Sequence, residues 1–525
     1  MIKIKKKYII FFFLIFFFTG INIHKDYGIY WDEEIQIQIG EENLNYIKNK
    51  IENSSYKNDV KNPEYGIIFE VPVTKLIQVL NISNNSEQIY FRHLCVFLIF
   101  FISCIFFYLL ILERFKCSVI SIILTAILIT SPRIFADSFY NSKDLVFLSL
   151  IIINFYISII FIKNPTYKNA FLFSLFSTIS ICLRINGIVI PVLIFFFIFI
   201  KYLRSDYNKR LIALHITTIF LLIIFTIIFW PFLWENPFEN FIKSFLIFKK
   251  YNINIFSLYD GNFINNKTIP WNYSLNWIYI TTPISYLILV VLGFIIFLRR
   301  ILKRLLKIND NNNYRDLWRG NSELFDLIAF SVIFTSLFSI IVFKSVIYNG
   351  WRHLYYIYPF MLFISGLSIK YLFISNKEKN INKFFKFLII LSIFFNINWL
   401  IKNHPFQYVF FNYLAGKNVH NNYEMDYWGV SNKFALEKIL EDTNKSIIKV
   451  SNISDTSLIA NISILKNNEK KIEYEKNLID SDYIINNNFF LDGNYHRTKK
   501  IPKNFIKFYD IKVDNNVVMS ILKKE

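Results

Sequence analysis

The chain has 525 residues, of which 54% are hydrophobic and 19% aromatic, including 59 phenylalanines. A soluble protein of this length could not bury so many large apolar side chains, and long runs with hardly a charge recur along it, so we predict a polytopic membrane protein. In a soluble protein the net charge of +20 would indicate a nucleic-acid partner. Here we assign it to basic loops on one side of a membrane and expect no nucleic-acid partner.

Eleven apolar segments are candidates for membrane spans, which need about 20 residues as a helix. The first follows the basic stretch "KIKKK" and has no small-residue cleavage site behind it, so we interpret it as an uncleaved span and not as a signal peptide. Arg184 separates the fifth segment from the sixth, and we expect these two to form a tight or broken pair. The predicted spans are 8–23, 94–112, 117–131, 145–162, 170–183, 185–200, 211–230, 278–298, 324–343, 354–373 and 385–401.

Basic residues in the short loops predict the orientation of these spans. With eleven spans and a cytoplasmic N-terminus, every strongly basic short segment falls on the cytoplasmic side, among them "ERFK", "KYLRSDYNKR" and "NKEKNINKFFK". The first long loop, 24–93, and the tail from residue 402 then lie on the outer side. Within that loop, "YGIIFEVPVTKLIQVL" indicates a helix along the membrane interface.

The composition changes after the last predicted span, so we divide the chain into a multi-span domain, 1–401, and a small extracytoplasmic domain, 402–525. In the second part, "YWGVSNKFALEKIL" has helical periodicity, whereas "SIIKVSNIS", "SDYIINN" and "FIKFYDIKV" are typical of short strands. The predicted fold class is therefore an all-α polytopic membrane protein with a small C-terminal α/β domain.

The four cysteines give no sign of a metal centre. Cys95, Cys104, Cys117 and Cys182 lie in or beside apolar runs, which indicates buried packing and not a disulfide or a nucleophile. We predict no metal site and no cofactor.

Three consecutive acids, Asp32, Glu33 and Glu34, follow the first span within the stretch "DYGIYWDEEIQ". Any single carboxylate at such a place is most simply explained as interfacial polarity facing water. The aromatic surroundings favour a second interpretation, because a carboxylate with restricted water has a raised pKa, which suits a general base near neutral pH.

Cationic side chains are predicted on the same outer side. Arg133, Lys143, Arg184, Arg352 and His353 all fall close to the outer ends of spans. Each could lie in the headgroup layer or pair with a loop acid. Taken together with the acids, the arginines indicate a site for an anionic ligand, since guanidinium groups bind phosphate oxygens through paired donors. A lipid-linked phosphate is the natural ligand at this depth.

An acidic pair directly after the first span resembles the first-loop motif of the GT-C class of integral membrane glycosyltransferases. The chain is most similar to the dolichyl-phosphate-mannose protein mannosyltransferase family (family 39) and its bacterial relatives, including the lipid A aminoarabinose transferases. The matching blocks, spread over residues 1–440, are "IYWDEEIQ", "SPRIFADSFYNSKD", "WPFLWENP", "YITTP", "NGWRHLYYIYP", "HPFQYVFFNYLAG" and "EMDYWGVS".

This resemblance implies an inverting transferase that takes a sugar from a polyprenyl-phosphate donor to a lipid, glycan or protein hydroxyl outside a bacterial inner membrane. It assigns Asp32 as catalytic base and Glu33 as its neighbour. Arg133, Lys143, Arg184, Arg352 and His353 are assigned to the donor phosphate by charge and side alone. No luminal MIR repeats are found, which leaves the acceptor open. A transporter or flippase of lipid-linked sugars remains an alternative, as do a non-catalytic membrane scaffold and a surface-polysaccharide polymerase or ligase.

Overall fold

The computed structural model describes residues 4–52, 63–204, 209–249, 254–306, 317–375, 379–465 and 470–525. Parts of three predicted cytoplasmic loops, 205–208, 307–316 and 376–378, lie outside the described residues. The remaining sequence forms a helical body followed by a small sheet.

Nine helical segments of the described chain are long and apolar enough to cross a membrane. Two shorter apolar helices, α5 (Ser118–Ile129) and α8 (Tyr167–Leu183), occupy the other two predicted positions, so the predicted eleven apolar segments all form helices. The longer elements are α1 (Lys6–Ile23), α4 (Asn85–Phe115), α7 (Asp144–Lys163), α9 (Val189–Arg204) with η1 (Ile185–Ile188), α10 (Lys209–Phe229), α13 (Ile284–Leu306), α14 (Gly320–Phe343), α15 (Tyr358–Lys370) with η3 (Arg352–Ile357) and η4 (Tyr371–Ser375), and α16 (Lys379–Lys402).

One predicted boundary is wrong. The span expected at 278–298 contains a break: α12 (Tyr273–Thr281) ends first, Thr282 has an extended backbone, and α13 starts at Ile284. Pro283 explains the break, because proline has no amide hydrogen and disfavours helical backbone in the residue before it. The span is therefore 284–306.

Arg184 lies at a turn between two helices and not in the middle of a span. Its backbone is extended, with φ −146° and ψ 133°, and it separates α8 from η1. The predicted broken pair is confirmed, and the break allows a cation at this point without placing it in the apolar interior.

Amphipathic helices and a short hairpin connect the spans at one end. α3 (Glu70–Val79) confirms the helix predicted in this loop, whereas α2 (Glu33–Ile51) was not expected. The two pack closely at Gly40, where an added Cβ would lie 2.5 Å from Thr74 Oγ1. The other elements between spans are α6 (Pro132–Asp137), η2 (Pro231–Leu233), α11 (Pro237–Lys249), β1 (Phe256–Tyr259) and β2 (Asn262–Asn265). After the last span, α16, follow η5 (Gln407–Val409), η6 (Tyr413–Ala415) and α17 (Val419–Asn422).

The C-terminal part contains a five-stranded mixed sheet of order β4-β3-β5-β7-β6. β3 pairs in parallel with β4 and β5, while β7 is antiparallel to β5 and β6. Asp514 and Asn515, both with positive φ, make the tight turn between β6 and β7. Its elements are α18 (Ser431–Asp442), β3 (Ile447–Asn452), α19 (Leu458–Ser463), β4 (Lys471–Tyr474), η7 (Leu478–Asp480), β5 (Tyr483–Asn486), η8 (Tyr495–Lys500), β6 (Phe505–Val513) and β7 (Asn516–Lys524).

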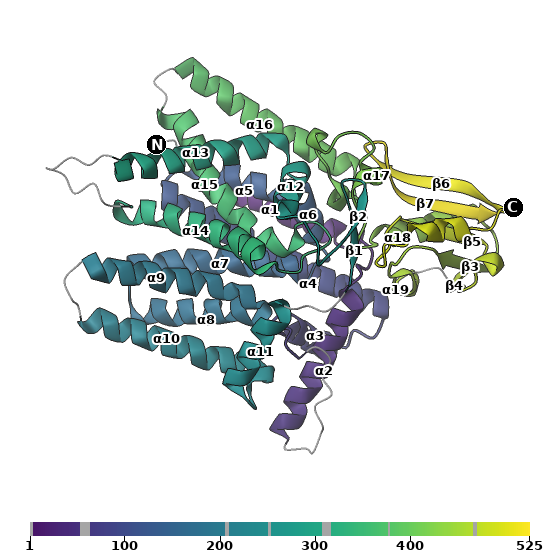
Figure 1. Cartoon of the computed structure of the whole chain (residues 1–525), viewed down its shortest axis with the longest axis horizontal. Coiled ribbons are helices and arrows are strands. Elements are labelled where there is room, and N and C mark those ends of the chain that lie inside the picture. Colours follow the sequence, from purple (N-terminus) through teal and green to yellow (C-terminus); the bar gives the residue numbers. More distant parts are fainter. Residues whose placement is uncertain are drawn as a thin grey trace.

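The spans run along the long axis of the molecule, and the C-terminal sheet lies at one end of it (Figure 1). α2, α3 and α11 are near the same end, which is the arrangement predicted for the outer loops. The first loop, the connecting hairpin and the tail therefore meet on one side of the helical body.

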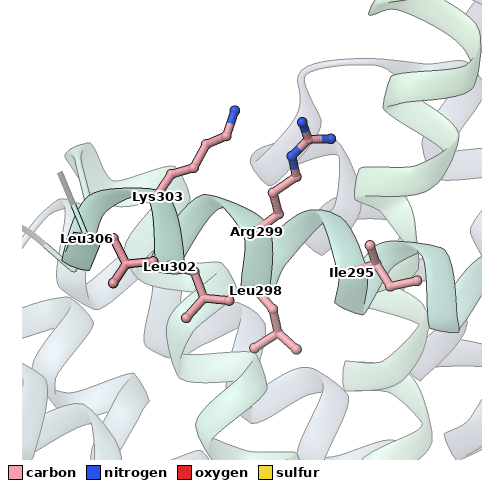
Figure 2. Close-up of a pocket in the computed structure, with 6 residues that line it drawn as sticks. All are labelled: Ile295, Leu298, Arg299, Leu302, Lys303 and Leu306. Atoms are coloured by element: carbon pink, nitrogen blue, oxygen red, sulfur yellow. The ribbon is translucent and has the colours of Figure 1, made fainter.

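The surface of α13 has the character of a lipid-facing helix. Leu298 and Leu302 are 41% and 52% exposed. Figure 2 shows these leucines on one side of the helix and Arg299 and Lys303 on the other. Aliphatic side chains in lipid with long cations reaching for the headgroups explain this surface, and since a single helix lines it, we do not assign it a ligand.

Candidate functional site

A cavity of about 500 Å³ opens where the first loop meets α7, α9, α14 and η3. One wall is apolar and belongs to α9 and α14, with Val189, Val192, Leu193, Ile340 and Phe343. The polar and charged part of the lining includes five of the seven side chains selected from the sequence: Asp32, Lys143, Arg184, Arg352 and His353.

Asp32 is the acid that faces this cavity. It directly precedes α2, whose first turn fixes its backbone through the bond from Gln36 N to Asp32 O, 3.0 Å. Its side chain is 23% exposed and accepts a hydrogen bond from Arg352 Nη1 at 3.2 Å. A carboxylate so placed is fixed in position and still open to a reactant.

Asp144, to which the sequence assigned no role, links the two arginines of the cavity. Its buried side chain pairs with Arg184 through Oδ1, and its Oδ2 lies 3.5 Å from Arg352 Nη1. Asn141 holds this acid from both sides, accepting from the Asp144 amide at 2.8 Å and donating to its carboxylate at 3.2 Å. The arginines come from segments far apart in sequence, and a single buried carboxylate brings them together.

The Arg352 guanidinium lies between aromatic rings. It is 4.9 Å from the centre of the Tyr348 ring and 4.5 Å from that of Trp428. Asn349 and Gly350, with φ of 55° and 73°, form the tight turn that brings Arg352 to the cavity at the start of η3. Within the described residues the buried Arg352 Nε has no hydrogen-bond partner, so the two acids do not satisfy the whole guanidinium.

Lys143 adds a third cation at the start of α7. Its ammonium lies 3.7 Å from the centre of the Tyr65 ring and faces the cavity. Burial, followed by repulsion from Arg184, lowers the pKa of Lys143 to about 7. This amine therefore changes charge near neutral pH, and an anion in the cavity would favour its charged form.

His353 lines the cavity beside Arg352, with its ring 5.0 Å from that of Tyr348 at 69°. In the described part of the chain its Nδ1 is buried without a hydrogen-bond partner. The histidine therefore keeps one ring nitrogen unpaired beside the site.

Glu33 points away from the cavity, although it adjoins Asp32. It is buried beside Arg92, with 3.6 Å between Oε1 and Nε, and beside His93, with 3.2 Å between Oε2 and Nε2. Glu70 takes the other side of the Arg92 guanidinium at 2.5 Å. This cluster joins α2 and α3 to α4 beneath the polar part of the cavity lining.

Arg133 also lies outside the cavity lining. Its Nε donates to Phe410 O at 3.1 Å, and its guanidinium stacks on Trp277 and Phe411 at 5.4 and 4.7 Å from the ring centres. The structure therefore separates Glu33 and Arg133 from the other five selected residues.

The contribution of Trp428 could not be recognised in the sequence, because it depends on a contact with the distant Arg352. Asp144 had a usable signal, namely an acid at the very start of an apolar run. The positive charge between Asp32 and Asp144 is a guanidinium, and among the described residues no three His, Cys, Asp or Glu side chains group as metal ligands.

No protein-family model matches this chain, and a search of curated proteins finds no relative. Among solved structures, the oligosaccharyltransferase of Archaeoglobus fulgidus with a tethered acceptor peptide is similar, with a TM-score of 0.52 and 11% identity over 96% of this chain and 73% of that one. The same enzyme with an inhibitory peptide and a dolichol-phosphate gives 0.50 and 10%, over 95% and 73%.

The ArnT of Cupriavidus metallidurans bound to undecaprenyl phosphate is aligned over 99% of this chain and 98% of its own, with a TM-score of 0.46 and 10% identity. At such identities the comparisons speak for the fold alone. The chain has a GT-C-like membrane fold, in agreement with the expectation from its sequence blocks.

Proposed function

We propose that this chain is an inverting glycosyltransferase that moves a sugar from a polyprenyl-phosphate donor to an acceptor hydroxyl. The observation that carries this proposal is the cavity itself, in which Asp32 and three cations line a groove with an apolar wall. An isoprenoid chain needs an apolar surface, a phosphate needs cations and a reacting hydroxyl needs a base, and the lining of this cavity contains all three.

The donor would lie with its isoprenoid against α9 and α14 and its phosphate near Arg184 and Arg352. Val192 on α9 and Phe343 on α14 are 56% and 53% exposed, so the apolar wall continues onto the lipid-facing surface. A lipid tail could then stay in the bilayer while its phosphate reaches the cations. The archaeal neighbour in complex with a dolichol-phosphate supports a donor of this class.

In the proposed reaction the acceptor oxygen attacks the anomeric carbon as the bond from that carbon to the phosphate oxygen breaks. Asp32 takes the hydroxyl proton, and polyprenyl phosphate leaves with its added negative charge beside the arginines. A positioned general base contributes about 10²–10⁴-fold, and electrostatic stabilisation of the leaving group is of similar size. A single displacement inverts the anomeric centre.

Binding of the donor would also prepare the base. Without a ligand, Arg352 donates to Asp32 at 3.2 Å. A phosphate that takes over this guanidinium would release the Asp32 oxygen for the acceptor hydroxyl. The Arg352 pair thus couples occupancy of the phosphate position to the availability of the base.

The site would face outward in a bacterial inner membrane, with the N-terminus in the cytoplasm and the C-terminal part, 402–525, outside. The polar part of the cavity lining and the C-terminal sheet belong to the same end of the molecule, so the proposal places donor, acceptor and tail together on the outer side. The acceptor could be a lipid, a glycan or a protein.

The test is sugar transfer from a panel of radiolabelled polyprenyl-phosphate sugars by purified wild type, Asp32→Asn and Glu34→Gln. Glu34 is a matched control because it is an exposed acid two residues further along the same segment. We expect transfer by wild type and Glu34→Gln, and a loss of at least 100-fold in Asp32→Asn, which keeps the size of the side chain but removes its basicity.

Equal transfer by Asp32→Asn and wild type would disprove the role of Asp32. If wild type instead moves an intact lipid-linked sugar across vesicles without releasing sugar from lipid, the flippase alternative is correct. Both assays use the same reconstituted vesicles, so insertion of each variant is verified once for both readouts.

A further inference from the structure

The segment that carries Asp32 has no regular structure of its own. Residues 28–30 lie outside any helix or strand, and α2 begins only at Glu33. The amide groups of such a segment need partners from elsewhere in the fold. Two of these partners come from the C-terminal part of the chain, more than 390 residues later in the sequence.

Asn461 supplies the first contact. Its Oδ1 accepts from the Ile29 amide at 2.9 Å, and its Nδ2 donates to the Ile29 carbonyl at 3.0 Å. One side chain therefore satisfies both backbone groups of a single residue, as a neighbouring strand would. Asn461 is fully buried, and its Nδ2 is oriented further by the Ser457 carbonyl at 2.8 Å.

Trp428 supplies the second contact. Its carbonyl accepts from the Trp31 amide at 2.9 Å, while its ring lies over Arg352. The residue immediately before Asp32 and the arginine that pairs with Asp32 are thus held by the same tryptophan. Between the two contacts the Tyr30 ring meets the Trp428 ring edge-on at 5.2 Å.

Gly28 shows how closely the two parts approach. A Cβ added there would lie 2.6 Å from Asn461 Oδ1 and 2.6 Å from the Val430 carbonyl. Ile29 is buried next to this contact in a small apolar cluster with Ile89, Ala460 and Ile464. The contact is a close-packed one that fixes the backbone at residues 28–31.

We infer that Asn461 is a positioning residue for the transfer reaction, acting through the backbone of Ile29 to hold Asp32 at the cavity. This inference rests on the proposed function, and it makes the C-terminal part a structural component of the active site. Asn461 is not among the residues that line the cavity, so its removal should spare donor binding. A displacement of about 1 Å at a catalytic group can cost about 100-fold in rate.

The experiment compares Asn461→Ala with Asn452→Ala in the full-length protein, reconstituted in nanodiscs. Asn452 is a matched control, because it is a partly buried asparagine of the same sheet region whose Nδ2 bonds a local carbonyl, that of Ser454, at 2.7 Å. We measure kcat and KM for the donor, and hydrogen exchange of the Ile29 and Trp31 amides.

For Asn461→Ala we expect a kcat lowered about 10- to 100-fold, a donor KM within twofold of wild type, and faster exchange at Ile29. Asn452→Ala should match wild type in all three readouts. Asn461→Asp, which keeps the acceptor for the Ile29 amide, should recover part of the lost kcat. Equal kcat values for Asn461→Ala and Asn452→Ala, or unchanged exchange at Ile29, would overturn the inference.

Gly28→Ala disturbs the contact with Asn461 by adding a Cβ to the segment before Asp32. It is the alternative variant if Asn461→Ala does not insert stably. It should lower kcat while donor KM stays constant, and a kcat within twofold of wild type would contradict the inference. Failure of the proposed function would give a different result, because wild type would then release no sugar from any donor. That result would also overturn the inference about Asn461.

Discussion

The two ends of the helical body contain charge clusters built from the same residue types but with different geometry. At the cavity, Arg352 makes single contacts of 3.2 and 3.5 Å to two acids, Asp32 and Asp144. At the other end, Arg114 donates from Nε and Nη2 to both oxygens of Asp326, each at 2.6 Å. The second pair is bidentate, whereas in the first Arg352 Nε has no partner among the described residues.

The residues around the two clusters also differ. Arg300 adds a further contact of 2.9 Å to Asp326, so three helices, α4, α13 and α14, are joined at a fully buried carboxylate. Ile340, on the cavity wall, lies about 20 Å along α14 from Asp326. Among the described residues Arg300 Nε lacks a hydrogen-bond partner just as Arg352 Nε does, so the two clusters differ in the bidentate pair at Asp326 and in the cavity beside Arg352. A charge beside a cavity can exchange partners with a ligand, whereas the charges at Asp326 cross-link helices. The contrast can be tested at each end separately.

The largest effect should follow from opening the cluster at Asp326. Asp326→Asn leaves Arg114 and Arg300 without their counter-charge, and breaking a buried pair costs about 3–5 kcal/mol. We expect a marked loss of thermal stability in detergent, with the donor KM of the surviving folded protein unchanged. Glu441→Gln is the control, since Glu441 is an exposed partner of Lys438 and such pairs contribute little to stability.

At the cavity we expect a mutation to reduce activity more than stability, the opposite of the result expected at Asp326. Arg352→Ala removes a charge that stabilises the leaving phosphate, and loss of one such donor costs about 10²–10³-fold in kcat. Single-turnover transfer measures this directly. Arg133→Ala removes a buried arginine outside the cavity, so it should lower stability while donor KM stays constant. A larger loss of donor binding in Arg133→Ala than in Arg352→Ala would refute this distinction.

The smallest effect concerns Lys143. Because burial lowers its pKa to about 7, the free cavity loses this positive charge as the pH rises through 7. A donor phosphodiester does not titrate in this range, so its affinity should fall between pH 7 and 9 and level off below pH 6. Lys143→Arg keeps its charge throughout and should remove the slope. A wild-type affinity that is flat from pH 6 to 9 would exclude Lys143 from the phosphate position.

The local sequence pattern of α2 does not match the structure that the segment adopts. In α2 the residues Ile35 to Ile39 alternate with glutamine, which is typical of a strand. The segment is nevertheless helical, because Gln36, Ile39 and Asn43 form one buried face at helical spacing. The neighbouring helix α3, reached through a loop partly outside the described residues, decides this outcome.

By itself the sequence determined the apolar segments, the break at Arg184, the main strands of the C-terminal sheet and the GT-C-like fold. The first three depend on local composition, which a sequence displays directly, whereas the GT-C-like fold was expected from the resemblance of blocks such as "IYWDEEIQ" and "NGWRHLYYIYP". The tertiary structure alone decided that the adjacent acids Asp32 and Glu33 diverge, that Asp144 joins two distant arginines, and that Asn461 holds the segment before α2. Such relations arise from contacts between residues 40 to 432 positions apart in the chain, and no periodicity records them.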